Sequence, residues 1–199
     1  MADFDRIIHP NKVTYPPMIP GQDSWGQSGK PQFRTTNQVG RTWIEEYPPM
    51  KASEANTRKF LAYINNLWRN RTIFTIQHKH LGTPVNAPIT GPLATNGASQ
   101  TGSTLNVTAN LTAALLYGDI ITIIGINTVF DIIEDMTSGT DSTLILNPPL
   151  TTGMTYSNPA TITYNSVKFR CVLDEGTEFP SCDIDGVYEG LILKFREAP

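Results

Sequence analysis

Positive charge is absent from the middle of this chain. All 15 lysine and arginine residues lie in residues 1–79 or 168–199, and none lies between these ranges. Residues 82–159 carry five acidic residues and a net charge of −5, whereas the rest of the chain carries 15 basic against 13 acidic residues. An abrupt change of composition is typical of a boundary between domains. We therefore expect residues 82–159 to form an inserted domain, and residues 1–81 and 160–199 to pair as one discontinuous domain.

The overall charge argues against sequence-specific nucleic-acid recognition. The formal net charge is −3, so the chain lacks the strongly positive character of most nucleic-acid-binding domains. Charged residues make up 17% of the sequence, below the roughly 25% usual in globular domains. Interfaces between subunits are depleted in charged residues, so this composition favours a surface that is partly covered in an assembly.

Nothing in the sequence predicts membrane insertion or a secretory signal. The longest apolar stretch, Ile120–Val129, is interrupted by polar residues and is far shorter than the roughly 20 residues of a spanning helix. The first residues, Met1–Arg6, lack the basic start and apolar run of a signal peptide, so we expect no export by that route.

One helix is expected in the flanking segments. Residues 1–40, rich in Pro, Gly, Asn and Gln, are expected to be an extended arm with an edge strand near Lys12–Tyr15. Ser53 is a candidate N-cap and Glu54 suits the first turn of a helix that ends near Asn70. Its apolar stripe has helical spacing and consists of Phe60, Leu61, Ile64, Leu67 and Trp68.

The remaining segments predict strands. In the flanks they are Arg41–Tyr47, Arg71–His78, Ala160–Asp174 and Val187–Glu197. In the middle segment they are Leu105–Thr108, Asp119–Gly125, Thr128–Glu134 and Ser142–Leu146, the last of which we expect Pro148-Pro149 to end. The predicted fold class is mainly β (α+β): a β-barrel or sandwich-like domain with one long helix, and an inserted small β-barrel of the partly closed, five-stranded kind.

Candidate catalytic and metal-binding residues are few. His78 and His80 would point to one side of a strand, as a metal site requires, but no third or fourth ligand is nearby in the sequence. Glu45 and Glu46 are adjacent on a strand, so they face opposite ways and cannot form an acid/base pair. The acidic residues that could suggest a calcium site do not match a calcium-loop spacing; they are Asp131, Glu134, Asp135 and Asp141.

We therefore predict no catalytic, cofactor-binding or metal-binding site, and no enzyme activity. Cys171 and Cys182 are expected to be free thiols. A stacking surface for single-stranded nucleic acid is a weaker hypothesis than an ordinary helix exterior; its residues are Arg41, Trp43, Arg58, Lys59, Trp68, Arg69, Arg71 and Lys79.

Two parts of the chain resemble tail-tip proteins of long-tailed bacteriophages, and distal tail proteins in particular. Trp43–Ala55 followed by Phe60–Arg69 resembles the strand-turn-helix segment of that family. Tyr117–Ile123, Val129–Ile132 and Leu144–Leu150 resemble segments of its inserted domain, in the same relative order.

The resemblance implies a virion protein made in the cytoplasm of a bacterial host. Distal tail proteins form a ring, usually a hexamer, that joins the tail tube protein to the baseplate hub protein and the host-adsorption apparatus. Their ring domain is built from both chain ends, and a second domain, often of the oligonucleotide/oligosaccharide-binding (OB) type, projects outward. In this chain residues 82–159 would take that second position, where side tail fibres or cell-surface glycan are possible partners.

Two other hypotheses stay open at this point. The chain could be a non-catalytic carbohydrate-binding module that uses Tyr117, Phe130 and Tyr156 as aromatic platforms. It could also be a small hydrolase built around His78 and His80. Binding of polysaccharide by a monomer would favour the first hypothesis, and metal analysis would test the second.

Overall fold

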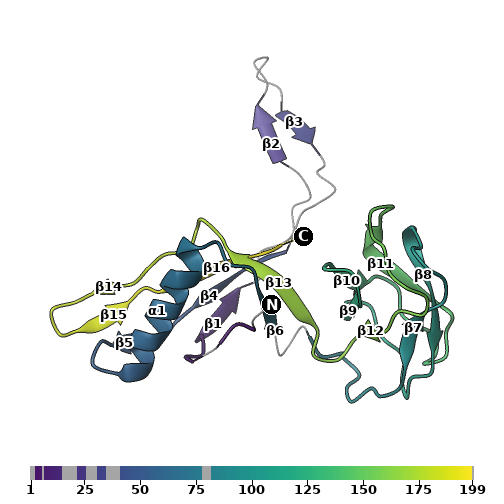
Figure 1. The fold of residues 1–199 in the computed structure, drawn as a ribbon, viewed down its shortest axis with the longest axis horizontal. Helices are drawn as coiled ribbons and strands as arrows, with labels where there is room; N and C mark the ends of the chain where they lie inside the picture. The colour runs from purple at the N-terminus through teal and green to yellow at the C-terminus, as the bar shows by residue number, and fades with distance from the viewer. Residues whose placement is uncertain are drawn as a thin grey trace. The chain divides into compact units, whose positions relative to one another are not determined.

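The computed structural model describes residues 3–5, 7–14, 22–25, 31–34, 41–77 and 82–198. Within these residues the protein is mainly β-structure with one helix, as the sequence predicts (Figure 1). The chain divides into two compact units: residues 1–74 with 171–199, and residues 75–170. The expected insertion, residues 82–159, falls inside the second unit. No helix in the described part of the chain is long and apolar enough to cross a membrane.

A five-stranded sheet built from both ends of the chain is the centre of the first unit. Its strand order is β1-β4-β16-β13-β6. The strands are β1 (Lys12–Thr14), β4 (Thr42–Glu46), β16 (Ile192–Glu197), β13 (Lys168–Leu173) and β6 (Phe74–Gln77). The antiparallel pair β4 and β16 places Phe195 opposite Trp43, and their rings stack with centroids 5.3 Å apart. Burial of this pair ties the N-terminal third of the chain to its C-terminus.

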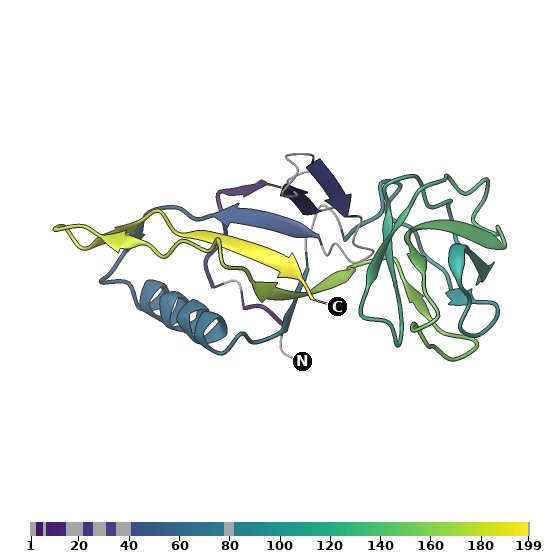
Figure 2. The same ribbon diagram turned by 90° about the horizontal axis from the view of Figure 1, so that it is seen from above.

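The helix α1 (Ala55–Arg69) lies beside the strands of this unit, as Figure 2 shows from above, and buries one face of its surface. Its buried residues are Thr57, Phe60, Ile64 and Leu67. Phe60 meets Tyr47 at a centroid distance of 5.1 Å. Leu61 and Trp68, which the helical pattern assigns to the same stripe, are only half-buried. They lie at the margin of the buried face and remain accessible.

The N-terminal end of α1 differs from the sequence prediction in its capping residue. The N-cap is Glu54, which makes no side-chain capping bond, so the assignment of Ser53 as the cap was wrong. At the other end the Arg71 amide donates to the carbonyl of Trp68 and the Thr72 amide to that of Leu67. Arg71 has φ +47, and this left-handed residue with its two bonds closes the helix with a Schellman motif.

A small three-stranded sheet extends the first unit beside α1. It has the order β14-β15-β5, with β14 (Ser181–Cys182), β15 (Val187–Glu189) and β5 (Met50–Lys51). The expected single strand over Val187–Glu197 is therefore divided into β15 and β16. The break falls at Gly190, whose φ of +78 is accessible to glycine at little cost.

A hairpin in the N-terminal segment pairs β2 (Gln22–Trp25) with β3 (Pro31–Arg34) as a separate two-stranded sheet. The described part of the expected arm over residues 1–40 consists of these strands, β1 and residues 3–5 and 7–11. Phe4 is buried, and its ring centroid lies 5.2 Å from that of Phe74 and 5.5 Å from that of Phe195. The expectation of an extended arm was therefore wrong for this first part, which packs on the core of the first unit. The rest of that arm, and His78 and His80, lie outside the described residues.

The second unit is a six-stranded, nearly closed β-barrel with the order β12-β9-β10-β11-β8-β7. Its strands are β7 (Leu93–Thr95), β8 (Gly102–Ala109), β9 (Ile120–Ile123), β10 (Val129–Ile132), β11 (Thr143–Leu150) and β12 (Ile162–Thr163). A bridge between Ala94 and Thr161 joins the two edges, and the Thr95 amide donates to the carbonyl of Ala160 over 2.9 Å. The predicted hairpin of β9 and β10 is confirmed, with Phe130 opposite Ile121.

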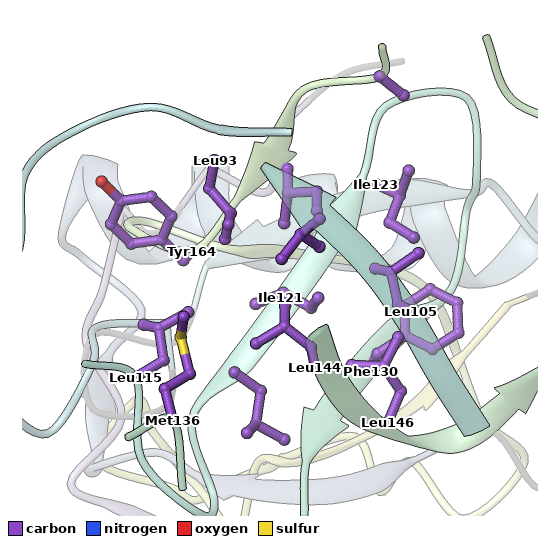
Figure 3. Packing of buried hydrophobic residues seen from close by; sticks show 14 of the residues in the cluster. Leu93, Leu105, Leu115, Ile121, Ile123, Phe130, Met136, Leu144, Leu146 and Tyr164 are labelled. Carbon is purple, nitrogen blue, oxygen red and sulfur yellow. The ribbon is translucent and has the colours of Figure 1, made fainter. Parts of the chain in front are cut away.

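The inward residues of these strands form one core (Figure 3). Its fully buried members include Leu105, Ile121, Phe130 and Leu144. This strand count differs from the expected five-stranded barrel, because the two- and three-residue strands β12 and β7 are too short to show a clear alternation in sequence.

The expectation that Pro148-Pro149 end a strand was wrong. β11 continues through both prolines to Leu150, which pairs with Gly102. The register with β8 shifts between Ile145 and Leu150, so the prolines lie in an irregular part of the ladder. Proline is tolerated at such bulges because no regular ladder bond from its nitrogen is required there.

Candidate functional site

The acidic residues considered for calcium have structural partners in the protein. Asp135 accepts a hydrogen bond from the Tyr117 amide over 2.6 Å. Asp141 accepts from the amides of Thr137 and Ser138 and from the Ser138 hydroxyl. Burial raises the pKa of Asp141, but these hydrogen bonds outweigh it and leave the pKa lowered. Among the residues with described positions, no group of three or more His, Cys, Asp or Glu side chains could hold a metal ion.

Asp119 is the acidic side chain that is buried in the barrel, with 3% of its surface exposed. Its two carboxylate oxygens accept from the Val85 and Leu116 amides, each over 2.8 Å. Both amides belong to segments outside the strands, so the carboxylate fixes two connections of the barrel.

The two cysteines are both free, as expected, and they differ in environment. Cys171 is buried in the first unit, and burial raises the pKa of its thiol far above the ordinary range, with Glu197 and Glu45 adding to the effect. Cys182 is exposed on β14.

Glu45 and Glu46 point to opposite sides of β4, as predicted from their adjacency. Glu45 is fully buried and accepts a hydrogen bond from the Tyr47 hydroxyl over 2.7 Å. Glu46 is only half-buried and pairs with Lys12 on the neighbouring strand over 2.6 Å. The alternation along β4 places Glu45 on the core side, but a charged side chain does not predict burial by itself. Glu45 was therefore not identified from the sequence as a core residue.

The proposed aromatic platforms do not form one surface. Phe130 is fully buried and Tyr156 is 8% exposed, whereas Tyr117 is 69% exposed. The Tyr156 hydroxyl accepts from the Gln100 amide over 2.9 Å, so this ring braces a loop of the barrel. The prediction of a three-residue platform was therefore wrong, since stacking on a sugar requires an exposed ring face.

The basic and aromatic residues considered for nucleic acid do not all lie on an exposed surface. Trp43 is 1% exposed within the core and cannot stack on a base. The Arg71 guanidinium lies 4.8 Å from the centre of the Trp68 ring, so this ring already has a cation on it. Lys79 lies outside the described residues.

An apolar groove lies between α1 and the β14–β15 hairpin in the first unit. We call it the helix–hairpin groove; its volume is about 300 Å³, and it is lined by Leu61, Ala62, Asn65, Phe179, Pro180 and Tyr188. Phe179 is 42% exposed and its ring meets Trp68 edge-on at 6.1 Å. Four of the six lining residues carry purely apolar side chains, so the groove offers an accessible surface for another apolar group.

The turn that joins β14 to β15 carries an uncovered isoleucine. Ile184 is 101% exposed. The turn is held by the Asp183 carboxylate, which accepts from the Val187 amide over 2.6 Å, and by backbone bonds of Asp183 with Val187 and Gly186. The Gly186 carbonyl also accepts from the Ala52 amide over 2.8 Å, which fastens the turn to the loop before α1.

Sequence reasoning missed both features. The run from Asp183 to Gly186 is a plausible turn, and an isoleucine within a turn was the available signal of a surface contact. Comparison with known proteins adds no identification: no protein-family model matches the chain, and no curated protein matches it.

Proposed function

We propose that the protein is a structural component of a bacteriophage tail tip, of the distal tail kind, which assembles into a ring within the virion. The first unit forms the ring between the tail tube and the baseplate hub. The second unit is available to other tail components or to cell-surface glycan. The proposal assigns the protein no catalytic activity.

The observation that carries this proposal is the way the chain is divided. The central sheet of the first unit combines β1 and β4 from the N-terminal part with β16 from the C-terminus, while residues 75–170 form a second unit. This is the plan that the resemblance to distal tail proteins implies. A chain that builds one unit from both of its ends can carry a second unit without interrupting contacts made by the first.

Two further features support an assembly role. β1 is a three-residue edge strand, and an edge strand offers backbone donors and acceptors to a neighbouring chain. The hairpin of β2 and β3 pairs as its own sheet, in keeping with an arm that reaches a neighbour. The low content of charged residues, 17%, suits a surface used in subunit contacts.

The test is the mass of the purified full chain, measured by light scattering behind size exclusion at several concentrations and two salt levels. We expect a discrete ring of 22.0 kDa chains, or a mass that rises with concentration towards one. A strict monomer that binds polysaccharide, with binding lost in Tyr117→Ala, would overturn the proposal in favour of a carbohydrate-binding module. Tyr117 is the variant of choice because it is the exposed ring of the three considered.

A further inference from the structure

We propose that the Ile184 tip of one copy of this protein docks into the helix–hairpin groove of a second copy. The inference deepens the proposed function and rests on it for the expectation that the resulting chain of contacts closes into a ring. Tip and groove are both parts of the first unit, so each copy carries both halves of the contact.

The tip cannot fill the groove of its own chain. The groove is lined by Phe179 and Pro180 before β14 and by Tyr188 within β15, so it lies beside the paired part of the same hairpin. Ile184 is held at the far end of that hairpin by the Asp183 bonds and by the Ala52–Gly186 bond. Its full exposure shows that no described part of the same chain covers it.

The chemistry of the two surfaces is complementary. The tip is a bare isoleucine between two aspartates, Asp183 and Asp185. The groove is apolar, and its helix residues Leu61, Ala62 and Asn65 continue on the same face of α1 to the exposed Arg69. In the proposed contact an apolar side chain flanked by two aspartates therefore meets an apolar groove that continues towards an arginine. This charge arrangement favours the tip of a second copy as the occupant of the groove.

Tip and groove are different patches, so two copies can either exchange tips as a two-fold pair or add head to tail through a heterologous contact, and the proposed ring requires the second arrangement. A heterologous contact leaves one free tip and one free groove at the ends of any open chain of copies. Addition of copies therefore continues until the two ends meet. A second copy of this chain is thus the occupant that satisfies both exposed surfaces at once, and a ring is the closed form.

A photo-cross-linking amino acid at position 184 tests the contact in the full chain. The protein with the probe is mixed with ¹⁵N-labelled wild type, irradiated and digested with trypsin. Trypsin releases the groove side of α1 as the single peptide Phe60–Arg69. We expect unlabelled probe peptides joined to the labelled Phe60–Arg69 peptide, which can arise only between copies. The same probe at the exposed Tyr117 of the second unit is the control.

Two variants of the labelled partner make the test specific. Ala62→Glu places a negative charge in the groove at an exposed position that does not contribute to the core. We expect it to lower the yield of the cross-link by about tenfold, the change that corresponds to about 1.4 kcal/mol of affinity. Asn56→Glu makes the same charge change on an exposed position of α1 outside the groove and should leave the yield unchanged.

The outcomes separate this inference from the proposed function. The other groove residues, Phe179, Pro180 and Tyr188, lie in the tryptic peptide Cys171–Lys194, so a labelled copy of that peptide joined at one of them also supports the contact. If light scattering shows a ring but the probe joins neither set of groove residues above the Tyr117 control, the tip–groove contact is wrong and the ring uses another surface. If the probe joins Phe60–Arg69 and the mass either stops at a dimer or grows without limit, the contact stands and the proposed ring falls. If neither association nor cross-link occurs, both are overturned.

Discussion

Replacement of Gly91 by alanine is expected to destabilise the second unit strongly. Gly91 has φ +122, a conformation that residues with a side chain rarely adopt. Its neighbours are bonded to the chain around Asn110: the Asn110 amide donates to the Pro92 carbonyl, and the Thr112 amide to the Thr90 carbonyl. A Cβ at Gly91 would lie 3.0 Å from the carbonyl carbon of Asn110 and closer still to its oxygen.

The expected loss combines two effects. Holding alanine at such a φ costs roughly 1–3 kcal/mol. Separating two hydrogen-bonded backbone segments to make room for the methyl group costs about as much as overpacking a core, roughly 1–3 kcal/mol. We expect Gly91→Ala to lower the free energy of unfolding by about 4 kcal/mol, a large part of the roughly 5–15 kcal/mol that a domain has.

Gly118→Ala is the matched control for backbone strain alone. Gly118 has φ +88, and a Cβ there would meet no atom within 4 Å. We expect this variant to lose about 1–2 kcal/mol, the ordinary cost of a left-handed conformation for a residue with a side chain. The difference between the two variants therefore combines the close approach of Gly91 to Asn110 with the additional backbone strain of φ +122 over φ +88.

The assay follows the two units separately. All three tryptophans, Trp25, Trp43 and Trp68, lie in the first unit, so their fluorescence reports on that unit. Hydrogen exchange of peptides from residues 91–123 reports on the barrel. We expect Gly91→Ala to accelerate exchange in the barrel and to leave the tryptophan transition in urea near that of wild type. Equal losses in Gly91→Ala and Gly118→Ala would refute the role of the close approach.

Three further predictions concern single polar groups. At pH 8 an alkylating reagent should label Cys182 in the native protein and Cys171 only after denaturation, because burial holds the Cys171 thiol pKa high; labelling of both native thiols, counted by mass, would contradict this. Asp119→Asn should lower the free energy of unfolding by roughly 1–3 kcal/mol, since one of the two amides bonded to this buried side chain loses its acceptor, and a urea midpoint equal to wild type would oppose it. The lowered pKa of Asp141 means that this carboxylate stabilises the turn above the ordinary aspartate pKa and that the stabilisation is lost as the pH falls through the lowered value. An NMR titration of the Thr137 amide should follow the loss, and a titration midpoint at or above the ordinary aspartate pKa would contradict the prediction.

Local patterns predicted the regular elements because each pattern records burial on one face. In β16 the alternation places Leu193 and Phe195 in the core, and both are fully buried. In α1 the helical spacing identified Phe60 and Ile64, whose exposed fraction is zero. These residues could be predicted because their neighbours along the same element determine which side faces inward.

The groove and the tip could not be predicted in the same way, because they depend on contacts between distant segments. Leu61 fits the apolar stripe of α1 but lines the groove, since the residues opposite it are Phe179 and Pro180, more than one hundred positions later. Ile184 lies in a plausible turn, and only the paired hairpin shows that none of the residues with described positions covers its side chain. A single sequence contains no local signal of which apolar residues remain exposed after folding.

The distribution of charge gives the two units different electrostatic roles. Residues 82–159 contain no cation, and the second unit carries Lys79, Lys168 and Arg170 only near its two chain ends. The other 12 of the 15 lysine and arginine residues, Arg69 among them, belong to the first unit. Because tip and groove both lie in the first unit, the proposed contact does not involve any residue of the barrel. If the proposed contact forms the assembly, substitutions on the exposed surface of the barrel should leave that assembly unchanged. Residues 82–159 carry no cation that would compete with Arg69 for the aspartates of a neighbouring tip.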